Sequence, residues 1–122
     1  MKVIILDTSS IIFGLSNRID TFQRLKESFP TYRITIPYGV VRELKRIANG
    51  KKKEKLQARI GLGLIKEHAI SVVSGREYVD TWIIKHSGSS DTIICTNDVE
   101  LKQKLKGMGS KTISISRSGM LR

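Results

Sequence analysis

Two short apolar stretches of this 122-residue chain are each followed by an aspartate. Asp7 follows Val3–Leu6, and Asp98 comes two residues after the stretch Ile93–Thr96. Short runs of β-branched and apolar residues are typical of buried strands, and the carboxyl ends of parallel strands meet at one edge of a sheet. Each aspartate alone is also an ordinary helix N-cap. Together the two residues predict a pair of carboxylates at the same sheet edge.

Two further acids lie beside the apolar stripes of segments with helical periodicity. Glu43 stands three residues after Val40 and four before Ile47, which directs it towards the sheet edge. A surface glutamate is the alternative. On a helical wheel Asp80 falls inside the arc of its apolar neighbours. Because an unpaired buried charge is costly, a carboxylate there requires a positive partner, unless Asp80 simply caps the helix.

Four carboxylates in one cleft repel one another and raise each other's pKa unless a cation compensates them. A set of oxygen ligands suits Mg²⁺ or Mn²⁺. Zinc is disfavoured, because His68 and His86 have no nearby histidine partner and Cys95 is the single cysteine. We expect both histidines to be structural or surface residues and Cys95 to lie in the core. The other acids are interpreted as caps or surface charges: Asp20, Glu27, Glu54, Glu67, Glu77, Asp91 and Glu100.

The segments that carry these acids alternate between strand and helix patterns. Strands are predicted at 2–6, 32–37, 70–74, 91–96 and 111–116. Helices are predicted at 7–15, 20–29, 38–50, 51–69, 77–87 and 98–109. The alternation predicts an α/β fold, a three-layer α/β/α sandwich with a central parallel sheet of about five strands. Sites in such folds lie at the carboxyl ends of the strands.

The length and the net charge of the chain limit the classes of function that it can have. The chain fits one domain over residues 1–122. It has no bilayer-spanning apolar run, and no small-residue cleavage site follows its start, so we expect no membrane partner, no signal peptide and a cytoplasmic location. Lysine and arginine outnumber acids by 22 to 11, and the net charge of +11 favours nucleic acid as a partner. A solvated basic surface is the alternative.

Four segments together resemble the PIN-domain nuclease family over essentially the whole chain: ILDTS, IPYGVVREL, YVDTWI and TNDVELKQKL. The segments KKKEKLQARIGLGLIK and KTISISRSGMLR are more similar to the archaeal and eukaryotic branch linked to ribosomal RNA processing than to VapC-type toxins. Thr81 departs from that branch, whose members often carry a second aspartate at this position. The resemblance makes Asp7, Glu43, Asp80 and Asp98 the catalytic and metal-binding set. It makes Thr8, Ser9, Thr96 and Asn97 neighbours that orient ligands or water.

The resemblance implies a metal-dependent endoribonuclease that hydrolyses phosphodiester bonds of single-stranded RNA, using Mg²⁺ or Mn²⁺ and activated water rather than a protein nucleophile. The implied substrate is ribosomal RNA or its precursor, and the implied partners are a second copy of the chain and a ribosome-assembly protein or an antitoxin. Because an acidic cleft repels RNA, surrounding cations must bring the phosphate backbone in. Candidates for that contact are Arg42, Arg46, Lys51, Lys52, Lys53, Lys55 and Arg117.

Three other functions are alternatives for a chain with these features. A VapC-type toxin ribonuclease would use the same cleft and the same chemistry. A non-catalytic RNA-binding domain with a PIN fold is disfavoured by the intact set of four acids. A receiver-like phosphotransfer domain needs paired acids after the first strand and an acceptor aspartate after the third, whereas Thr8 follows Asp7 and the segment 70–75 contains no acid.

Overall fold

A computed structural model describes residues 1–122 and contains a five-stranded parallel sheet with the strand order β3-β2-β1-β4-β5. The strands are β1 (Val3–Leu6), β2 (Arg33–Pro37), β3 (Ser71–Val73), β4 (Thr92–Cys95) and β5 (Lys111–Ile113). The helices are α1 (Thr8–Ser16), α2 (Thr21–Ser28), α3 (Tyr38–Ala48), α4 (Lys55–Glu67), α5 (Val79–His86) and α6 (Val99–Gly107). The predicted three-layer α/β/α class is confirmed, and no helix combines the length and apolar character that crossing a bilayer requires.

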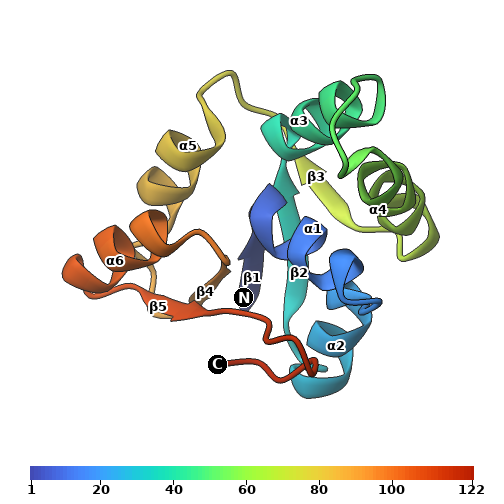
Figure 1. Ribbon diagram of the computed structural model, residues 1–122. Helices are drawn as coiled ribbons and strands as arrows, with labels where there is room; N and C mark the ends of the chain where they lie inside the picture. The colour runs from blue at the N-terminus through green and yellow to red at the C-terminus, as the bar shows by residue number, and fades with distance from the viewer.

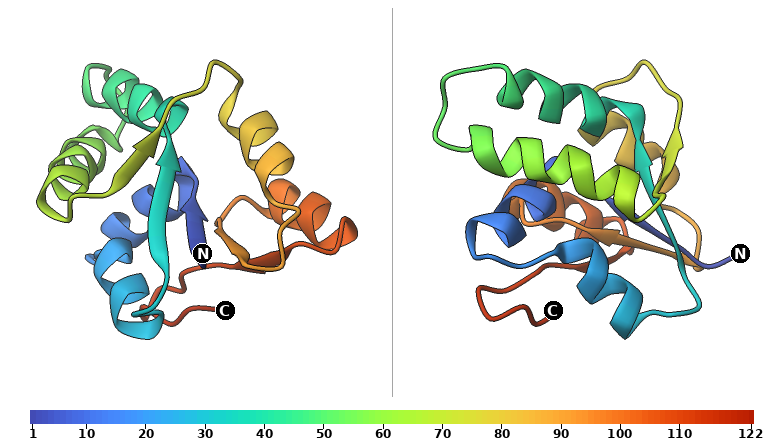
Figure 2. Two further views of the ribbon diagram at one scale, coloured as in Figure 1. Left: turned by 180° about the vertical axis from the view of Figure 1, so that it is seen from behind. Right: turned by 90° about the vertical axis from the view of Figure 1, so that its right-hand side faces the viewer.

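The order of the strands reverses at the centre of the sheet. The chain leaves β1 towards β2 and β3, and it leaves β4 in the opposite direction towards β5. Because crossovers between parallel strands are right-handed, the reversal places α5 and α6 on one face and α1 to α4 on the other (Figures 1 and 2). The carboxyl ends of β1 and β4 therefore form a topological switch point, where α/β proteins bind their ligands.

Pairing between β1 and β4 fixes which residues meet at that point. Ile4 pairs with Ile93 and Leu6 pairs with Cys95. The residues that follow this last pair are Asp7 and Thr96, and the Asp7 amide donates to the Cys95 carbonyl over 3.3 Å. The strands are buried on both faces, as their apolar runs predict. Cys95 is a core residue as expected, and burial raises the pKa of its thiol to about 12.

Close packing of α1 on α4 brings the start of α4 to the same edge. Gly61 of α4 is buried against α1, and a Cβ atom at that position would lie 3.0 Å from Ile11. The two helices can approach because this glycine has no side chain. Residues from the connection between α3 and α4 are thereby held beside the end of β1.

Two element boundaries differ from the sequence prediction by more than two residues. The helix predicted at 51–69 begins at Lys55, and residues 51–54 form a turn. Three successive lysines at a helix start oppose the positive end of the helix dipole, which explains the later start. The last strand ends at Ile113 rather than Ser116, and the chain then folds back through an antiparallel bridge between Ile115 and Leu121.

Candidate active site

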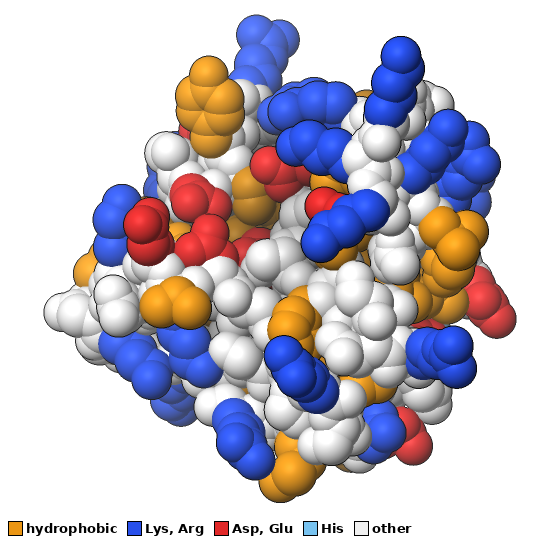
Figure 3. Space-filling model, viewed as in Figure 1, with side chains coloured by type: hydrophobic (Ala, Val, Ile, Leu, Met, Phe, Trp, Pro, Cys, Tyr) orange, Lys and Arg blue, Asp and Glu red, His pale blue; other side chains and the backbone are white.

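A hollow of about 360 Å³ opens at the carboxyl edge of the sheet, and we call it the acidic cavity. It is lined by α1, α3 and α5, by the residues Asp7 and Asp98 that follow β1 and β4, and by Glu54 of the turn before α4. Figure 3 shows acidic side chains gathered around this hollow, with lysines and arginines along its upper rim. All four acids singled out in the sequence line it, together with one that was not: Asp7, Glu43, Asp80, Asp98 and Glu54.

Asp7 is the most enclosed of these acids, with 4% of its surface exposed. It caps α1, since its Oδ1 accepts from the Ser10 amide over 3.1 Å. The Ser9 hydroxyl donates to both carboxylate oxygens over 2.8 Å, and the Thr96 hydroxyl donates to Oδ2. Burial raises the pKa of Asp7 from 3.8 to about 6; these hydrogen bonds lower it, and the charge of Asp80 adds to the rise. Asp7 is thus a carboxylate held in one orientation by three donors.

Thr96 links the two strand-end aspartates. Its hydroxyl donates to Asp7 and accepts from the Asp98 amide over 3.1 Å. Asp98 in turn caps α6, because its Oδ1 accepts from the Leu101 amide over 3.2 Å. The alternative reading of both aspartates as helix caps therefore describes their geometry correctly. The capping bond uses one oxygen of each carboxylate. It does not explain why both carboxylates line the same cavity.

Glu43 reaches the cavity from α3, on the opposite wall from Asp98. The side chain is half-buried and accepts a hydrogen bond from the Thr8 hydroxyl. Thr8 is the first residue of α1, so this bond ties α3 to the connection that follows β1. Glu43 and Asp7 consequently face the same space.

Asp80 lies in the first turn of α5 and is exposed, which differs from the helical-wheel estimate. The buried side of this short helix is formed by Val79, Trp82 and Ile83. A wheel gives angles around an axis but not the place where a helix begins, and the first turn projects from the core into the cavity. Partial desolvation raises the pKa of Asp80, as does the charge of Asp98, while Lys104 lowers it.

Glu54 is the site residue that sequence reasoning missed. Its Oε2 atom is buried without a hydrogen-bond partner, although the residue stands at the N-cap position of α4, where a side-chain cap bond is common. A buried carboxylate oxygen without a partner is unfavourable. No local pattern in KKKEK marks this residue, because its place depends on how α4 packs on α1.

The remaining predicted neighbours divide between two places. Thr8 and Ser9 line the acidic cavity. Asn97 binds the carboxy-terminal segment instead: its Oδ1 accepts from the Ile115 amide over 3.1 Å and its Nδ2 donates to the Ile115 carbonyl over 2.8 Å. Thr81 is exposed and does not line the cavity.

The candidate RNA-binding cations surround this edge at different depths. Arg46 lines the acidic cavity itself. Arg42 is exposed, 6.0 Å from the centre of the Tyr38 ring, and Arg117 lines a neighbouring hollow. The turn between α3 and α4 exposes Lys51, Lys52 and Lys53, and Lys55 at the start of α4 is half-buried.

The two histidines have structural roles, as expected from the sequence. His68 binds Asp20 through Nε2, with 2.7 Å between Nε2 and Oδ2. His86 stacks on Trp82 with 3.9 Å between ring centres, and its Nδ1 lies 2.8 Å from the Trp82 carbonyl oxygen. Neither histidine lines the acidic cavity.

The donor set fits a hard divalent cation. Carboxylate and hydroxyl oxygens surround the cavity, and no histidine or thiol competes with them. The unpartnered Glu54 oxygen and the raised pKa of Asp7 are both features that a bound cation would relieve. In the structure, no group of three acidic, histidine or cysteine side chains lies close enough together to coordinate a metal ion. To hold a cation, the more exposed acids would have to rotate towards Asp7.

Comparisons with known proteins give a consistent result. The family profile described as "PIN like domain" matches residues 4–118. The chain is 33% identical over 110 residues to "Ribonuclease VapC9" of Archaeoglobus fulgidus, covering 89% of this chain and 79% of the relative. It is 30% identical over 110 residues to "Ribonuclease VapC4" of Methanocaldococcus jannaschii, covering 86% and 83%. Among solved structures, the PIN domain endonuclease Utp24 superposes with a TM-score of 0.75 at 23% identity, over 98% of this chain and 89% of that one.

Proposed function

Since this chain belongs to the PIN-like domain family, we propose that it is an endoribonuclease that hydrolyses phosphodiester bonds of single-stranded RNA with the help of Mg²⁺ or Mn²⁺. The observation that carries the proposal is the gathering of Asp7, Glu43, Asp80 and Asp98 around one cavity at the switch point of the sheet. The two VapC ribonuclease relatives support the choice of RNA as substrate.

The carboxylates would hold the cation, with Asp7 as the fixed member. Three donors orient Asp7, whereas Asp80 is exposed and free to adjust. A divalent cation held there lowers the pKa of water and offsets the negative charge of the phosphate. Glu54 contributes a further oxygen at the α4 side of the cavity.

The proposal assigns no protein nucleophile to the reaction. The cavity contains no histidine, cysteine or lysine side chain. The Thr8 and Ser9 hydroxyls that line it donate to Glu43 and Asp7, and the proposed role of these hydroxyls is to orient the two carboxylates. The chain's residues would therefore orient water and the phosphodiester rather than form a covalent bond to RNA.

Cations around the acids would bring the RNA backbone in. Arg46 stands in the cavity wall, where its guanidinium can bind a phosphate oxygen. The exposed lysines of the α3–α4 turn extend the positive surface away from the cavity, and the net charge of +11 gives the whole molecule an attractive field for RNA. Binding should weaken as salt rises.

The test is cleavage of an unstructured single-stranded RNA by the purified protein. We expect cleavage with Mn²⁺ or Mg²⁺, no cleavage in EDTA, and loss of cleavage in Asp7→Asn, which keeps the size of the side chain and a capping oxygen. A protein that binds RNA tightly but cuts it under none of these conditions would be the non-catalytic RNA-binding domain instead. Equal activity in EDTA would contradict the metal-dependent mechanism.

Within this activity we propose ribosomal RNA or its precursor as the substrate, because the basic α3–α4 connection and the carboxy-terminal segment resemble the processing branch of the family. A toxin ribonuclease is the second candidate, and the identity with VapC9 and VapC4 favours it. Induced expression in a bacterial host discriminates the two. Growth arrest that is relieved by the product of an adjacent small gene would indicate a toxin and its antitoxin. Accumulation of uncut ribosomal RNA precursor after deletion of the gene would indicate processing, with a ribosome-assembly protein as the expected partner.

We also propose that the chain acts in the cytoplasm as one domain and forms a homodimer. Sedimentation of the purified protein over a range of concentrations tests the dimer. A single species with the 13.7 kDa mass of one chain at all concentrations would contradict it.

A further inference from the structure

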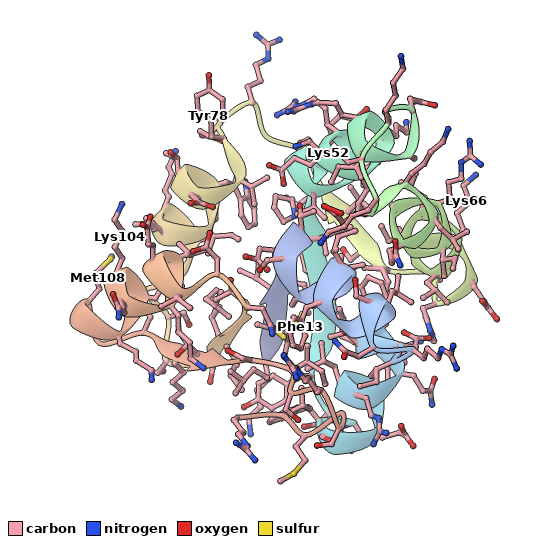
Figure 4. All side chains as sticks on the ribbon, viewed as in Figure 1. Phe13, Lys52, Lys66, Tyr78, Lys104 and Met108 are labelled. Carbon is pink, nitrogen blue, oxygen red and sulfur yellow. The ribbon has the colours of Figure 1, made fainter.

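A second hollow, of about 500 Å³, adjoins the acidic cavity, and we call it the Phe13 groove. Ser9 and Ile12 line both hollows, so the two are continuous along α1. The groove extends from there to Phe13, Asn17 and Arg117. Figure 4 shows Phe13 on α1, at the centre of the face that carries the acids.

Phe13 has no role in the hydrophobic core. Its neighbours Ile12 and Leu15 pack against the core cluster, whereas Phe13 belongs neither to that cluster nor to the residues packed on it. The side chain is half-buried, because the walls of the groove cover part of the ring. A partly exposed aromatic ring that lines a hollow beside the acidic cavity offers a stacking surface to a base.

Arg117 is held over the groove by a folded carboxy-terminal segment. Asn97 fixes Ile115 through two hydrogen bonds, and the Ser116 amide donates to the Met120 carbonyl over 2.8 Å. The intervening turn closes at Gly119, whose φ of +88° is readily adopted by glycine. The Arg117 side chain is exposed and forms no salt bridge with an acid, so its guanidinium is available to a phosphate.

Asn17 adds one directional group. Its Nδ2 donates to the Phe13 carbonyl over 2.9 Å, which orients the carboxamide and leaves its oxygen without a partner in the protein. That oxygen accepts hydrogen bonds, and every RNA base presents an N–H donor on the edge used for pairing. In a duplex this edge is occupied, so the groove favours an unpaired base.

We propose that the Phe13 groove binds one nucleotide of single-stranded RNA beside the phosphodiester bond in the acidic cavity, with its base stacked on Phe13 and a phosphate on Arg117. The inference rests on the proposed ribonuclease function and names a specificity-determining subsite for it. A nucleotide fits better than a protein segment. The groove runs directly into the acidic cavity, its one charged side chain is an unpaired arginine, and the net charge of +11 favours a polyanion.

The test measures RNA binding without cleavage. A fluorescein-labelled, unstructured RNA of twelve nucleotides is titrated with protein in EDTA, and anisotropy gives the Kd. We expect Phe13→Leu to raise the Kd about tenfold, because leucine keeps apolar bulk but removes the aromatic face. Phe13→Trp restores stacking and should bind within about twofold of wild type. Neither change should alter the Kd for double-stranded RNA.

Arg117→Gln tests the phosphate contact. Its Kd should rise by about threefold to tenfold. The slope of log Kd against log salt should fall by about one, which is the contribution of one phosphate contact. Arg122→Gln is the matched control, since Arg122 is exposed on the same segment but does not line the groove. It should bind within about twofold of wild type, and circular dichroism melts verify that every variant is folded.

The outcomes separate the subsite from the ribonuclease function. If wild type binds and cleaves RNA while Phe13→Leu and Arg117→Gln bind equally well, the subsite is overturned and the function stands. If wild type binds RNA through these residues but does not cleave it with Mn²⁺, the ribonuclease function fails and the groove remains an RNA-binding site. If wild type does not bind RNA, both are overturned.

Discussion

Aspartates cap helices at both edges of this sheet, with nearly the same local geometry and very different surroundings. At the carboxyl edge, Asp7 accepts from a backbone amide over 3.1 Å and Asp98 over 3.2 Å. Towards the opposite edge, beyond the end of α1, Asp20 accepts from the Gln23 amide over 3.1 Å. His68 donates to the second oxygen of Asp20 across 2.7 Å, while Lys26 lies 3.2 Å from the other ring nitrogen of His68. Asp7 and Asp98 meet other carboxylates instead.

The comparison shows that the capping bond does not distinguish a structural aspartate from a functional one. The difference lies in what faces the oxygen that the cap does not use. A basic partner completes the surroundings of Asp20 within the protein. The acidic cavity places five carboxylates around one space with Arg46 as its one basic lining residue. Burial is the main cause of the raised pKa of Asp7 and of Asp80, and a neighbouring carboxylate adds to the rise in each case. Carboxylates that repel one another in this way are stabilised by a bound cation, which is the physical case for a cation site.

The largest expected effect is the loss of cleavage in Asp98→Asn compared with Asp20→Asn. Asparagine is as good an N-cap as aspartate, so both variants should fold. Asp98→Asn removes a charge from the acidic cavity and should lower kcat/KM by more than about 100-fold, the scale of a lost metal ligand. Asp20→Asn should cleave like wild type. The measurement is the initial rate on single-stranded RNA with Mn²⁺.

Equal loss in both variants would show that the capping role, and not the cavity, explains the effect of Asp98. Melting curves of the two variants provide the control, because a lost cap lowers stability by about 1 kcal/mol in either helix. Retained activity in Asp98→Asn would remove this residue from the proposed set of ligands.

The second effect is a pH-dependent instability that originates at Asp7. The folded protein holds a proton on Asp7 up to about pH 6, whereas the unfolded chain releases it near 3.8. Protonated Asp7 therefore stabilises the folded state below about pH 4, and this contribution to the free energy of unfolding is lost as the pH rises through 6. The difference between the two pKa values corresponds to a loss of about 3 kcal/mol in the free energy of unfolding at neutral pH.

Urea unfolding from pH 4 to 7.5 measures this effect by comparing wild type with Asp7→Asn. The free energy of unfolding of the variant should increase relative to that of wild type as the pH rises. Addition of Mn²⁺ at pH 7 should stabilise wild type more than the variant. Parallel pH profiles for the two proteins would contradict the assignment of the raised pKa to Asp7.

The third effect concerns Thr96, whose hydroxyl joins Asp7 to the Asp98 amide. Thr96→Val keeps the shape of the side chain and leaves Asp7 with fewer donors, so its orientation should loosen. We expect about a tenfold loss in kcat/KM and a weaker affinity for Mn²⁺, as for other groups that orient metal ligands. Thr92→Val is the matched control, since Thr92 is also buried and begins the strand that Thr96 follows, but it does not line the cavity.

An unchanged affinity for Mn²⁺ in Thr96→Val, measured by calorimetry, would restrict Thr96 to a structural role. A similar loss in Thr92→Val would mean that repacking of β4, rather than the hydroxyl, lowers the activity.

The sequence predicted the parts of this site that depend on strands. The apolar runs before Asp7 and near Asp98 identify buried parallel strands, and parallel strands bring their carboxyl ends together without further information. The exposure of Asp80 was not predictable from a helical wheel, because it depends on where α5 begins. The place of Glu54 and the anchoring of Ile115 by Asn97 depend on contacts between segments that lie far apart in the sequence. Local patterns carry no record of such contacts.

The smallest expected effect is at the opposite edge. His68→Asn removes the hydrogen bond to Asp20 and should lower the free energy of unfolding by about 1 kcal/mol, because both side chains are only partly exposed and the bond is short. Cleavage of RNA should be unchanged, since His68 contacts α2 and the start of β3 and lines no part of the acidic cavity. Urea unfolding and the initial cleavage rate are measured on the same preparation. A rate that fell as far as in Asp98→Asn would show that the two edges are coupled. The surroundings of the second carboxylate oxygen would then no longer distinguish a structural capping aspartate from a functional one.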